Sequence, residues 1–263
     1  MAKAFGDVFS YDATFCVNRY KMPFTPFVGV NHHGSSVVLA AALISHEDAG
    51  SFTWVFRRWL DCMGRAPSVI LTDHCKGISK AVKDVFTNTH HRLCLWHIMV
   101  NATKNLGSFV RYQEIIVDLW KIIDDSADSD DFEEAWHHFV AKYGLHENGW
   151  IIDSFQNRHS WVPLYWRDIF CVGMSSTQRS EQTNRFFKTY VNVETTLFKF
   201  FDSYQNALRS NDANQANDSE LVDGLDELVM NTQGEGLMLV RNSQPRSYNY
   251  PSFVNLLSVE HGS

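Results

Sequence analysis

Three acidic residues have the types and the sequence contexts needed for one divalent-metal site. Asp12 lies in YDATF, Asp73 ends VILTD, and Glu181 lies in QRSEQTN. Mg²⁺ or Mn²⁺ ions held by a few carboxylates can activate a water or a 3′-hydroxyl and stabilise the leaving oxygen during phosphoryl transfer. Without a metal, neighbouring carboxylates would repel one another and raise each other's pKa values. The three residues are therefore candidate catalytic and metal-binding groups for polynucleotidyl transfer.

The expected position of each carboxylate supports this grouping. Asp12 is expected in the middle of a strand between aromatic residues, where an unpaired charge is costly. Asp73 ends a short apolar strand, at the edge where α/β sheets gather ligands. Glu181 begins a helix that carries Asn184 and Arg185 on the same face. An alternative stays open: acidic residues at strand ends and helix starts are commonly caps or solvated charges, and periodicity alone favours that interpretation.

Cys94 and His97 form a C-x-x-H element, which is half of a zinc site. Four further histidines could complete the ligand set, although the sequence fixes no pairing: His90, His91, His137 and His138. The alternative is a buried cysteine at a strand end with a histidine that hydrogen-bonds nearby.

The elements that must position these residues alternate between strands and helices. Runs rich in β-branched and aromatic residues, and apolar residues at helical spacing, predict the order β-β-β-α-β-α-β. The predicted strands are 6–16, 26–32, 35–44, 69–73 and 90–96, and the predicted helices are 52–63 and 76–86. The second and third strands are joined at His33-Gly34, which is typical of a hairpin turn. A further helix is expected to begin near His97.

The rest of the chain divides into three parts. Apolar residues at helical spacing predict an all-helical insertion over 98–172, after a first sheet-forming part over 1–97. Residues 173–211 are expected to form closing helices that carry Glu181, opening with serine and threonine capping candidates. Residues 212–263 are expected to be acidic and loosely structured, with a loose helix over 211–236. The sequence therefore predicts an α/β protein.

Composition limits the possible function classes. The 263 residues carry a net charge of −7, whereas affinity for a phosphate backbone comes mostly from Lys and Arg. Binding to DNA should therefore be local or supplied elsewhere. The five cysteines include no C-x-x-C pair and are expected to be reduced. Since no long apolar run and no cleavable leader is evident, we expect a soluble intracellular protein that does not span a membrane.

Four blocks of sequence carry a resemblance to a known family. They are YDATFCVNRYKMPFTPFVGVNHHG, SFTWVFRRWLDCMGRAPSVILTDHCKGISKAV, HHRLCLWHI and GMSSTQRSEQTNRFFKTYV. Together they resemble the transposase domain of Mutator-like elements, and more closely the plant far-red-impaired-response and far-red-elongated-hypocotyl family of transcription regulators. The resemblance implies an RNase H-like mixed sheet of the DDE class, flanked by helices. It also implies that Asp12, Asp73 and Glu181 fall on the acidic triad, and that Cys94 and His97 match a C-x-x-H element.

The resemblance leaves two classes of function open. We favour a domesticated nuclear regulator whose RNase H-like domain is an inactive scaffold for homo- or hetero-dimers in transcription. The alternative is the catalytic domain of a DNA transposase that uses Mg²⁺ or Mn²⁺ for nicking and strand transfer. Complete relatives carry zinc-binding DNA-recognition modules at both ends. We do not expect them in this chain, so binding to DNA through this domain alone should be weak.

Overall fold

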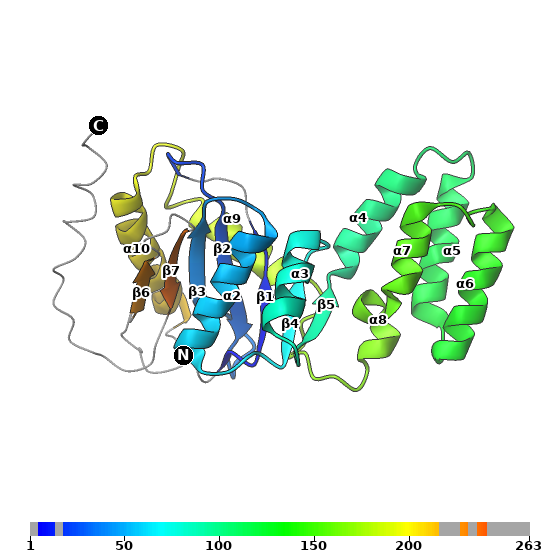
Figure 1. Ribbon diagram of the computed structural model, residues 1–263, viewed down its shortest axis with the longest axis horizontal. Helices are drawn as coiled ribbons and strands as arrows, with labels where there is room; N and C mark the ends of the chain where they lie inside the picture. Colours follow the sequence, from blue (N-terminus) through cyan, green and yellow to red (C-terminus); the bar gives the residue numbers. More distant parts are fainter. Residues whose placement is uncertain (1–4, 14–17, 216–226, 231–235, 241–263) are drawn as a thin grey trace.

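A computed structural model describes residues 5–13, 18–215, 227–230 and 236–240 and contains one mixed sheet flanked by helices (Figure 1). Within these residues the sheet has seven strands in the order β5-β4-β1-β2-β3-β7-β6. Their bounds are β1 Val8–Tyr11, β2 Phe24–Val30, β3 Ser36–Ile44, β4 Val69–Thr72, β5 His90–Leu93, β6 Glu227–Met230 and β7 Gly236–Val240. Strands β1, β4 and β5 are parallel, whereas β1, β2, β3, β7 and β6 pair in antiparallel fashion. The predicted order of strands and helices is observed.

A tight turn sets the register of the central hairpin. Asn31 follows the last residue of β2, and its side-chain oxygen accepts hydrogen bonds from the backbone N–H groups of His33 and Ser35. Gly34 has a φ of 78°, a left-handed conformation that glycine adopts without strain. The hairpin predicted at His33-Gly34 is therefore present.

Helices cover both faces of the sheet. On one face lie α2 (Ala49–Met63) and α3 (Lys76–Val85), and the Trp59 ring of α2 stacks on Phe27 of β2 with ring centroids 4.8 Å apart. Asp48 caps the N-terminus of α2 by accepting a hydrogen bond from the Ser51 N–H. On the other face, α9 (Gln178–Phe187) and α10 (Leu197–Gln215) bury Phe187, Phe200 and Tyr204 against β2, β3 and β7.

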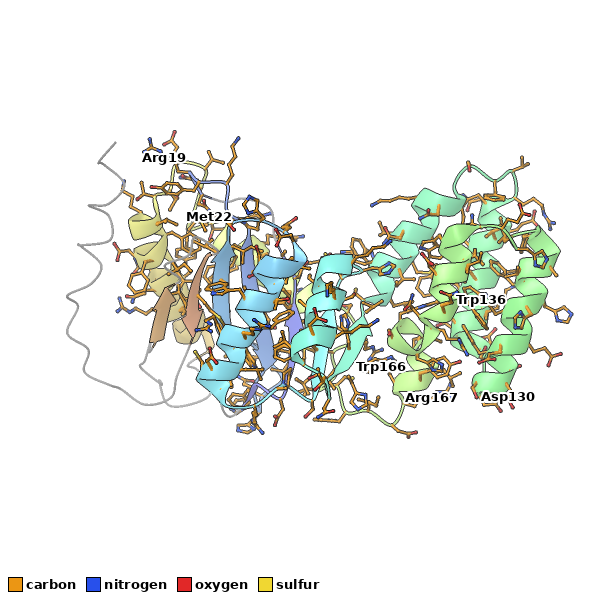
Figure 2. The ribbon with its side chains drawn as sticks, viewed as in Figure 1. Arg19, Met22, Asp130, Trp136, Trp166 and Arg167 are labelled. Carbon is orange, nitrogen blue, oxygen red and sulfur yellow. The ribbon has the colours of Figure 1, made fainter. Side chains whose placement is uncertain are left out.

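The segment between β5 and α9 is helical and has its own apolar core. Its elements are α4 (Leu95–Leu106), α5 (Tyr112–Asp125), α6 (Ser129–Tyr143), α7 (Gly149–Gln156), α8 (Arg158–Trp161) and the 3₁₀ helix η1 (Pro163–Trp166). We call residues 95–166 the helical segment. It extends beyond β5, at the end of the sheet opposite β6 (Figure 1). Trp136 lies among these helices and is 2% exposed (Figure 2). Within the described residues, no helix combines the length and apolar character needed to cross a bilayer.

The structure corrects three local predictions. Strand β1 ends at Tyr11, so Asp12 follows the strand and does not lie in its middle. Strand β5 ends at Leu93 and α4 already begins at Leu95, because the backbone turns at Cys94. The loose helix predicted over 211–236 is also wrong in part: α10 continues to Gln215, and β6 is a strand that pairs with β7. The remaining residues of 212–263 lie outside the described residues.

Candidate functional site

Three parallel strands end side by side and deliver three polar residues to one edge of the sheet. The paired last residues of β1, β4 and β5 are Tyr11, Thr72 and Leu93. The next residue in each case is Asp12, Asp73 or Cys94. The Cys94 N–H donates to the Thr72 carbonyl at 2.8 Å, which continues the ladder for one residue beyond the strands. Carboxyl ends of parallel strands are where α/β sheets place ligand-binding groups.

Asp12 is almost buried, at 9% exposed. Burial raises its pKa to about 7, because a desolvated carboxylate favours the proton, and repulsion from Asp73 adds to the rise. Glu181 contributes in the same direction, whereas the charge of His97 opposes it. Near neutral pH, Asp12 is therefore poised between its protonated and ionised forms.

Asp73 is held in a similar environment. Burial raises its pKa above the ordinary value, although His97 and His74 oppose the rise. Its Oδ1 atom is buried, and no described residue provides a hydrogen-bond partner for it. A buried carboxylate oxygen without a partner is costly unless a proton or a cation satisfies it.

Helix α9 brings Glu181 to this edge. The hydroxyl groups of Ser180 and Ser10 lie 2.6 Å apart and join α9 to β1. Thr177 occupies the N-cap position of α9 but makes no capping hydrogen bond with its side chain. Its Oγ1 instead lies 3.3 Å from His97 Nδ1. The expected capping role of this threonine is therefore replaced by a contact with the C-x-x-H element.

Cys94 and His97 interact with each other and with α9. Burial raises the pKa of the Cys94 thiol, but hydrogen bonds from His97 and Thr177 outweigh it and lower that pKa to about 7. The hydrogen bond to Cys94 raises the pKa of His97, although burial opposes the rise. The Thr177 N–H donates to Cys94 Sγ at 3.4 Å, and His97 Nε2 lies 3.8 Å from Glu181 Oε1. The pair thus links β5 and α4 to α9.

The donor chemistry fits a hard cation at Asp12 and Asp73, where a buried carboxylate oxygen has no partner among the described residues. A complete metal site would also require Glu181 to join these two carboxylates. Across the described ranges, no group of three or more His, Cys, Asp and Glu side chains is arranged to hold a metal ion. Glu181 Oε1 lies 3.8 Å from His97 Nε2. The metal assignment of Asp12, Asp73 and Glu181 stays a prediction.

Two of the histidines suggested as further zinc ligands, His91 and His137, make other contacts. His91 Nε2 lies 2.8 Å from Thr72 Oγ1. The His137 ring packs 5.2 Å from the Phe155 ring in the helical segment. No third ligand for Cys94 and His97 is arranged within the described residues. A zinc site at this pair also stays a prediction.

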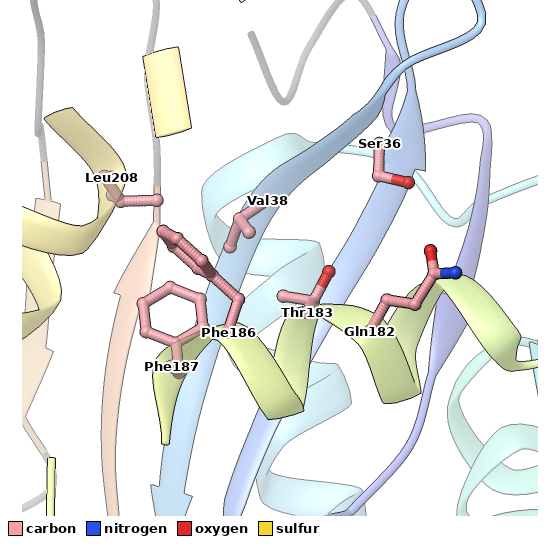
Figure 3. A pocket seen from close by; sticks show the side chains of 7 residues that line it. All are labelled: Ser36, Val38, Gln182, Thr183, Phe186, Phe187 and Leu208. Carbon is pink, nitrogen blue, oxygen red and sulfur yellow. The ribbon is translucent and has the colours of Figure 1, made fainter. Parts of the chain in front are cut away.

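A second feature of α9 is a pocket of about 220 Å³ between this helix, β3 and α10 (Figure 3). Its lining residues are Ser36, Val38, Gln182, Thr183, Phe186, Phe187 and Leu208. None of these side chains titrates near neutral pH or binds a metal strongly. This pocket therefore adds no acid–base or metal chemistry to the candidate site.

The site contains residues that the motifs did not reveal. Ser10, Ser180 and Thr177 bridge β1, α9 and α4, and of these three only Thr177 carried a sequence signal, as a capping candidate. Trp96 is 55% exposed and packs edge-on against His97, with ring centroids 4.7 Å apart. An exposed tryptophan beside the C-x-x-H element had no periodicity that could mark it.

Fold and sequence together define the class of protein. A β1-β2-β3 antiparallel unit, with β4 and β5 parallel beside β1 and helices on both faces, is an RNase H-like arrangement, as predicted. Residues 8–101 match the family model described as the MULE transposase domain. The chain therefore carries an RNase H-like transposase domain, and the resemblance drawn from its sequence blocks is confirmed.

The curated relatives are plant proteins related to FAR1. The chain is 39% identical over 208 residues to Protein FAR1-RELATED SEQUENCE 5 of Arabidopsis thaliana, covering 78% of this chain and 26% of that protein. It is 36% identical over 203 residues to Protein FAR-RED IMPAIRED RESPONSE 1 of the same plant, covering 76% of this chain and 24% of that protein. The chain thus spans about a quarter of the length of these relatives.

Proposed function

We propose that this chain is the RNase H-like scaffold of a transposase-derived plant regulator that acts on transcription in the nucleus. The similarity to FAR-RED IMPAIRED RESPONSE 1 and FAR1-RELATED SEQUENCE 5 supports the proposal. In this role the domain assembles with itself or with related chains. Since the chain carries 30 acidic against 23 basic residues, most of the contact with DNA comes from other parts of the assembly.

One observation carries the choice of a scaffold over an enzyme. Glu181, the third residue of the predicted triad, lies 3.8 Å from His97. This histidine in turn interacts with Cys94 and Thr177, so contacts among these side chains join Glu181 to the C-x-x-H element. These non-covalent contacts hold β5, α4 and α9 together, which is what a scaffold requires.

A tethering experiment tests the regulator. The whole chain is fused to a heterologous DNA-binding domain and expressed in plant cells with a reporter that carries the matching sites. We expect the fusion to enter the nucleus and to change reporter transcription relative to the DNA-binding domain alone. Asp73→Asn should keep this activity, whereas Trp59→Ala should lose it because the sheet core is disrupted. A wild-type fusion that leaves the reporter unchanged would argue against the proposal.

The unpartnered Asp73 oxygen favours a second candidate function, the catalytic domain of a Mutator-like DNA transposase. Asp12, Asp73 and Glu181 would then hold Mg²⁺ or Mn²⁺. Bound metal would supply an activated nucleophilic oxygen and stabilisation of the leaving oxygen. The chain's own residues would orient the DNA ends and exclude water from the buried edge.

Two measurements separate the candidates. Nicking or strand transfer is assayed with Mn²⁺ on inverted-repeat ends, with Asp73→Asn beside the wild type. Equal background activity of both proteins would contradict the proposal that the chain is a catalytic domain. Thermal melting with added Mg²⁺ or Mn²⁺ tests binding alone, since a ligand at ten times its dissociation constant stabilises the folded state by about 1.4 kcal/mol. A metal-dependent rise in melting temperature that Asp12→Ala abolishes would show that a cation binds there, and the nicking assay decides separately whether it supports catalysis.

A further inference from the structure

A cleft of about 610 Å³ lies at the junction between the sheet and the helical segment. One wall comes from α3, the loop after it and β5, and the other from α8, η1 and Ile169. Figure 2 marks Trp166, one of its lining residues, at this junction. Asp12, Asp73, Glu181, Cys94 and His97 do not line the cleft, whereas His90 and His91, two of the histidines suggested as further zinc ligands, do. Its volume falls within the range of about 300–1,000 Å³ that is typical of small-molecule sites.

The first wall favours an anion. Lys83, Thr87 and His90 line it, so a cation stands beside a hydroxyl and an imidazole. The lining residues include no Asp or Glu, although the chain as a whole carries a net charge of −7. The carboxylate of Asp84, next to Lys83 in sequence, pairs with Lys80 at 2.7 Å. A phosphate group suits this wall, because cations and hydroxyls both donate hydrogen bonds to its oxygens.

The second wall favours a flat ring. His159 and Tyr165 pack edge to face with ring centroids 4.2 Å apart, and His159 is exposed. Trp166 lies deeper, 6% exposed, with the Arg92 guanidinium 5.2 Å over its ring. Aromatic side chains at the wall of a cleft bind a planar ring by stacking and edge contacts, largely regardless of its substituents.

We propose that this cleft binds a nucleotide, with the phosphate at Lys83 and Thr87 and the base against His159 and Tyr165. The two walls separate these chemistries, so neither phosphate alone nor a ring alone would occupy both. The site is independent of the proposed function and of the acidic edge. Its ligand is either a free nucleotide or one nucleotide unit of a single strand, and both present the same phosphate and base.

Nuclear magnetic resonance of the whole chain tests the proposal. The reporter is the indole N–H signal of Trp166, assigned by its disappearance in Trp166→Phe. The probes are adenosine 5′-monophosphate, inorganic phosphate, phenyl phosphate and a short single-stranded oligodeoxynucleotide. We expect a saturable shift with adenosine monophosphate at about 1 mM or below, and weaker effects of phosphate and phenyl phosphate. A stronger response to the oligonucleotide, with the same dependence on Lys83, would assign the site to a nucleic-acid strand.

Matched variants locate the binding. Lys83→Ala should weaken adenosine monophosphate binding about tenfold, because a charge-assisted hydrogen bond is lost. Lys76→Ala, on the same helix but outside the cleft, should leave it unchanged. Tyr165→Leu should weaken the binding of adenosine monophosphate and leave the binding of inorganic phosphate unchanged. The proposal is overturned if no probe shifts Trp166 at about 10 mM, if phenyl phosphate equals the nucleotide, or if the two lysine variants behave alike. Circular dichroism confirms folding of each variant.

Discussion

The sheet edge that carries Asp12 and Asp73 largely buries these charged side chains, whereas the helical segment leaves its charged side chains at least partly exposed. At the edge, Asp12 and Asp73 are largely buried, and burial raises their pKa values. In the helical segment, no Asp, Glu, Lys or Arg of the described residues is buried, and the core consists of apolar and aromatic side chains. Its charged residues form partly exposed pairs instead, such as Arg158 with Glu133.

This difference separates stability from chemistry within one chain. A core of apolar side chains stabilises the fold at every pH, because burial of apolar surface does not depend on protonation. Desolvated carboxylates destabilise the fold when they ionise, so a structure retains them only where something else compensates for that cost. The helical segment is therefore expected to respond to volume, and the sheet edge to pH and cations.

The largest expected effect tests the apolar core of the helical segment. Trp136→Ala should lower the free energy of unfolding by about 3–5 kcal/mol, because the cavity left among its aromatic neighbours cannot close. Those neighbours include Phe132, Phe155 and Trp161, with ring centroids within 6.2 Å of Trp136. Chemical denaturation measures the loss, and it should be the same at pH 5 and pH 8. Trp120→Ala, at a 37% exposed position, is the control and should cost far less.

The next effect tests the sheet edge and depends on pH. The pKa of Asp12 rises from 3.8 to about 7 in the folded state, so the folded protein binds the proton more tightly than the unfolded chain does. The resulting stability is fully present below about pH 4 and is lost as pH rises through about 7. This loss is of the order of 4 kcal/mol.

Replacement of that carboxylate by an amide removes the titration. Asp12→Asn should be more stable than the wild type at pH 8 in metal-free buffer, and the difference should shrink toward zero near pH 4. Denaturant titrations across this pH range measure it. Asp168→Asn, at an exposed position, is the matched control and should follow the wild-type pH profile. A lower stability of Asp12→Asn at pH 8 would contradict the expected desolvation of Asp12.

A smaller effect tests how α9 is held on the sheet. Ser10 donates to the Val28 carbonyl at 3.4 Å, and its hydroxyl lies 2.6 Å from that of Ser180. Ser10→Ala should cost about 1–3 kcal/mol, because it leaves a buried hydroxyl of Ser180 without this partner. The double variant with Ser180→Ala should cost less than the sum of the single variants. Additive costs would show that the two hydroxyls do not interact, and exposed Ser108→Ala gives the baseline.

The sequence predicts the parts of this comparison that depend on local patterns. Strand-like runs and the turn at Gly34 predict the order of the first five strands along the chain, and the apolar run VILTD correctly predicts Asp73 at the end of a strand. Asp12 is displaced relative to the prediction because aromatic residues continue past Tyr11, whereas the strand stops there. The sequence from Val8 to Asp12 contains no signal that the strand ends at Tyr11.

Contacts between distant residues account for what the sequence does not predict. Ser10 and Ser180 are 170 positions apart, and their hydroxyls meet only because α9 packs on β1. Strand β7 pairs with the side of β3 that β2 does not occupy, through backbone pairing that extends from Ala40 to Ile44. Strand β6 pairs with β7 and forms the edge of the sheet. Both strands are short runs, ELVM and GLMLV, so the backbone pairing that adds them to the sheet requires little of the polar sequence around them.

The smallest effect tests the charges of the helical segment. Arg158 lies 2.7 Å from Glu133, with side chains 19% and 38% exposed. Glu133→Gln keeps an acceptor oxygen, and Arg158 stays fixed by the Phe155 carbonyl and ring. The loss should be below about 1 kcal/mol at low salt and should vanish near 1 M salt, where screening acts within about 3 Å. Glu134→Gln, one residue away and exposed, gives the baseline. A larger, salt-independent loss of stability would show that desolvated charges also stabilise the helical segment. The contrast between this segment and the sheet edge at Asp12 would then be wrong.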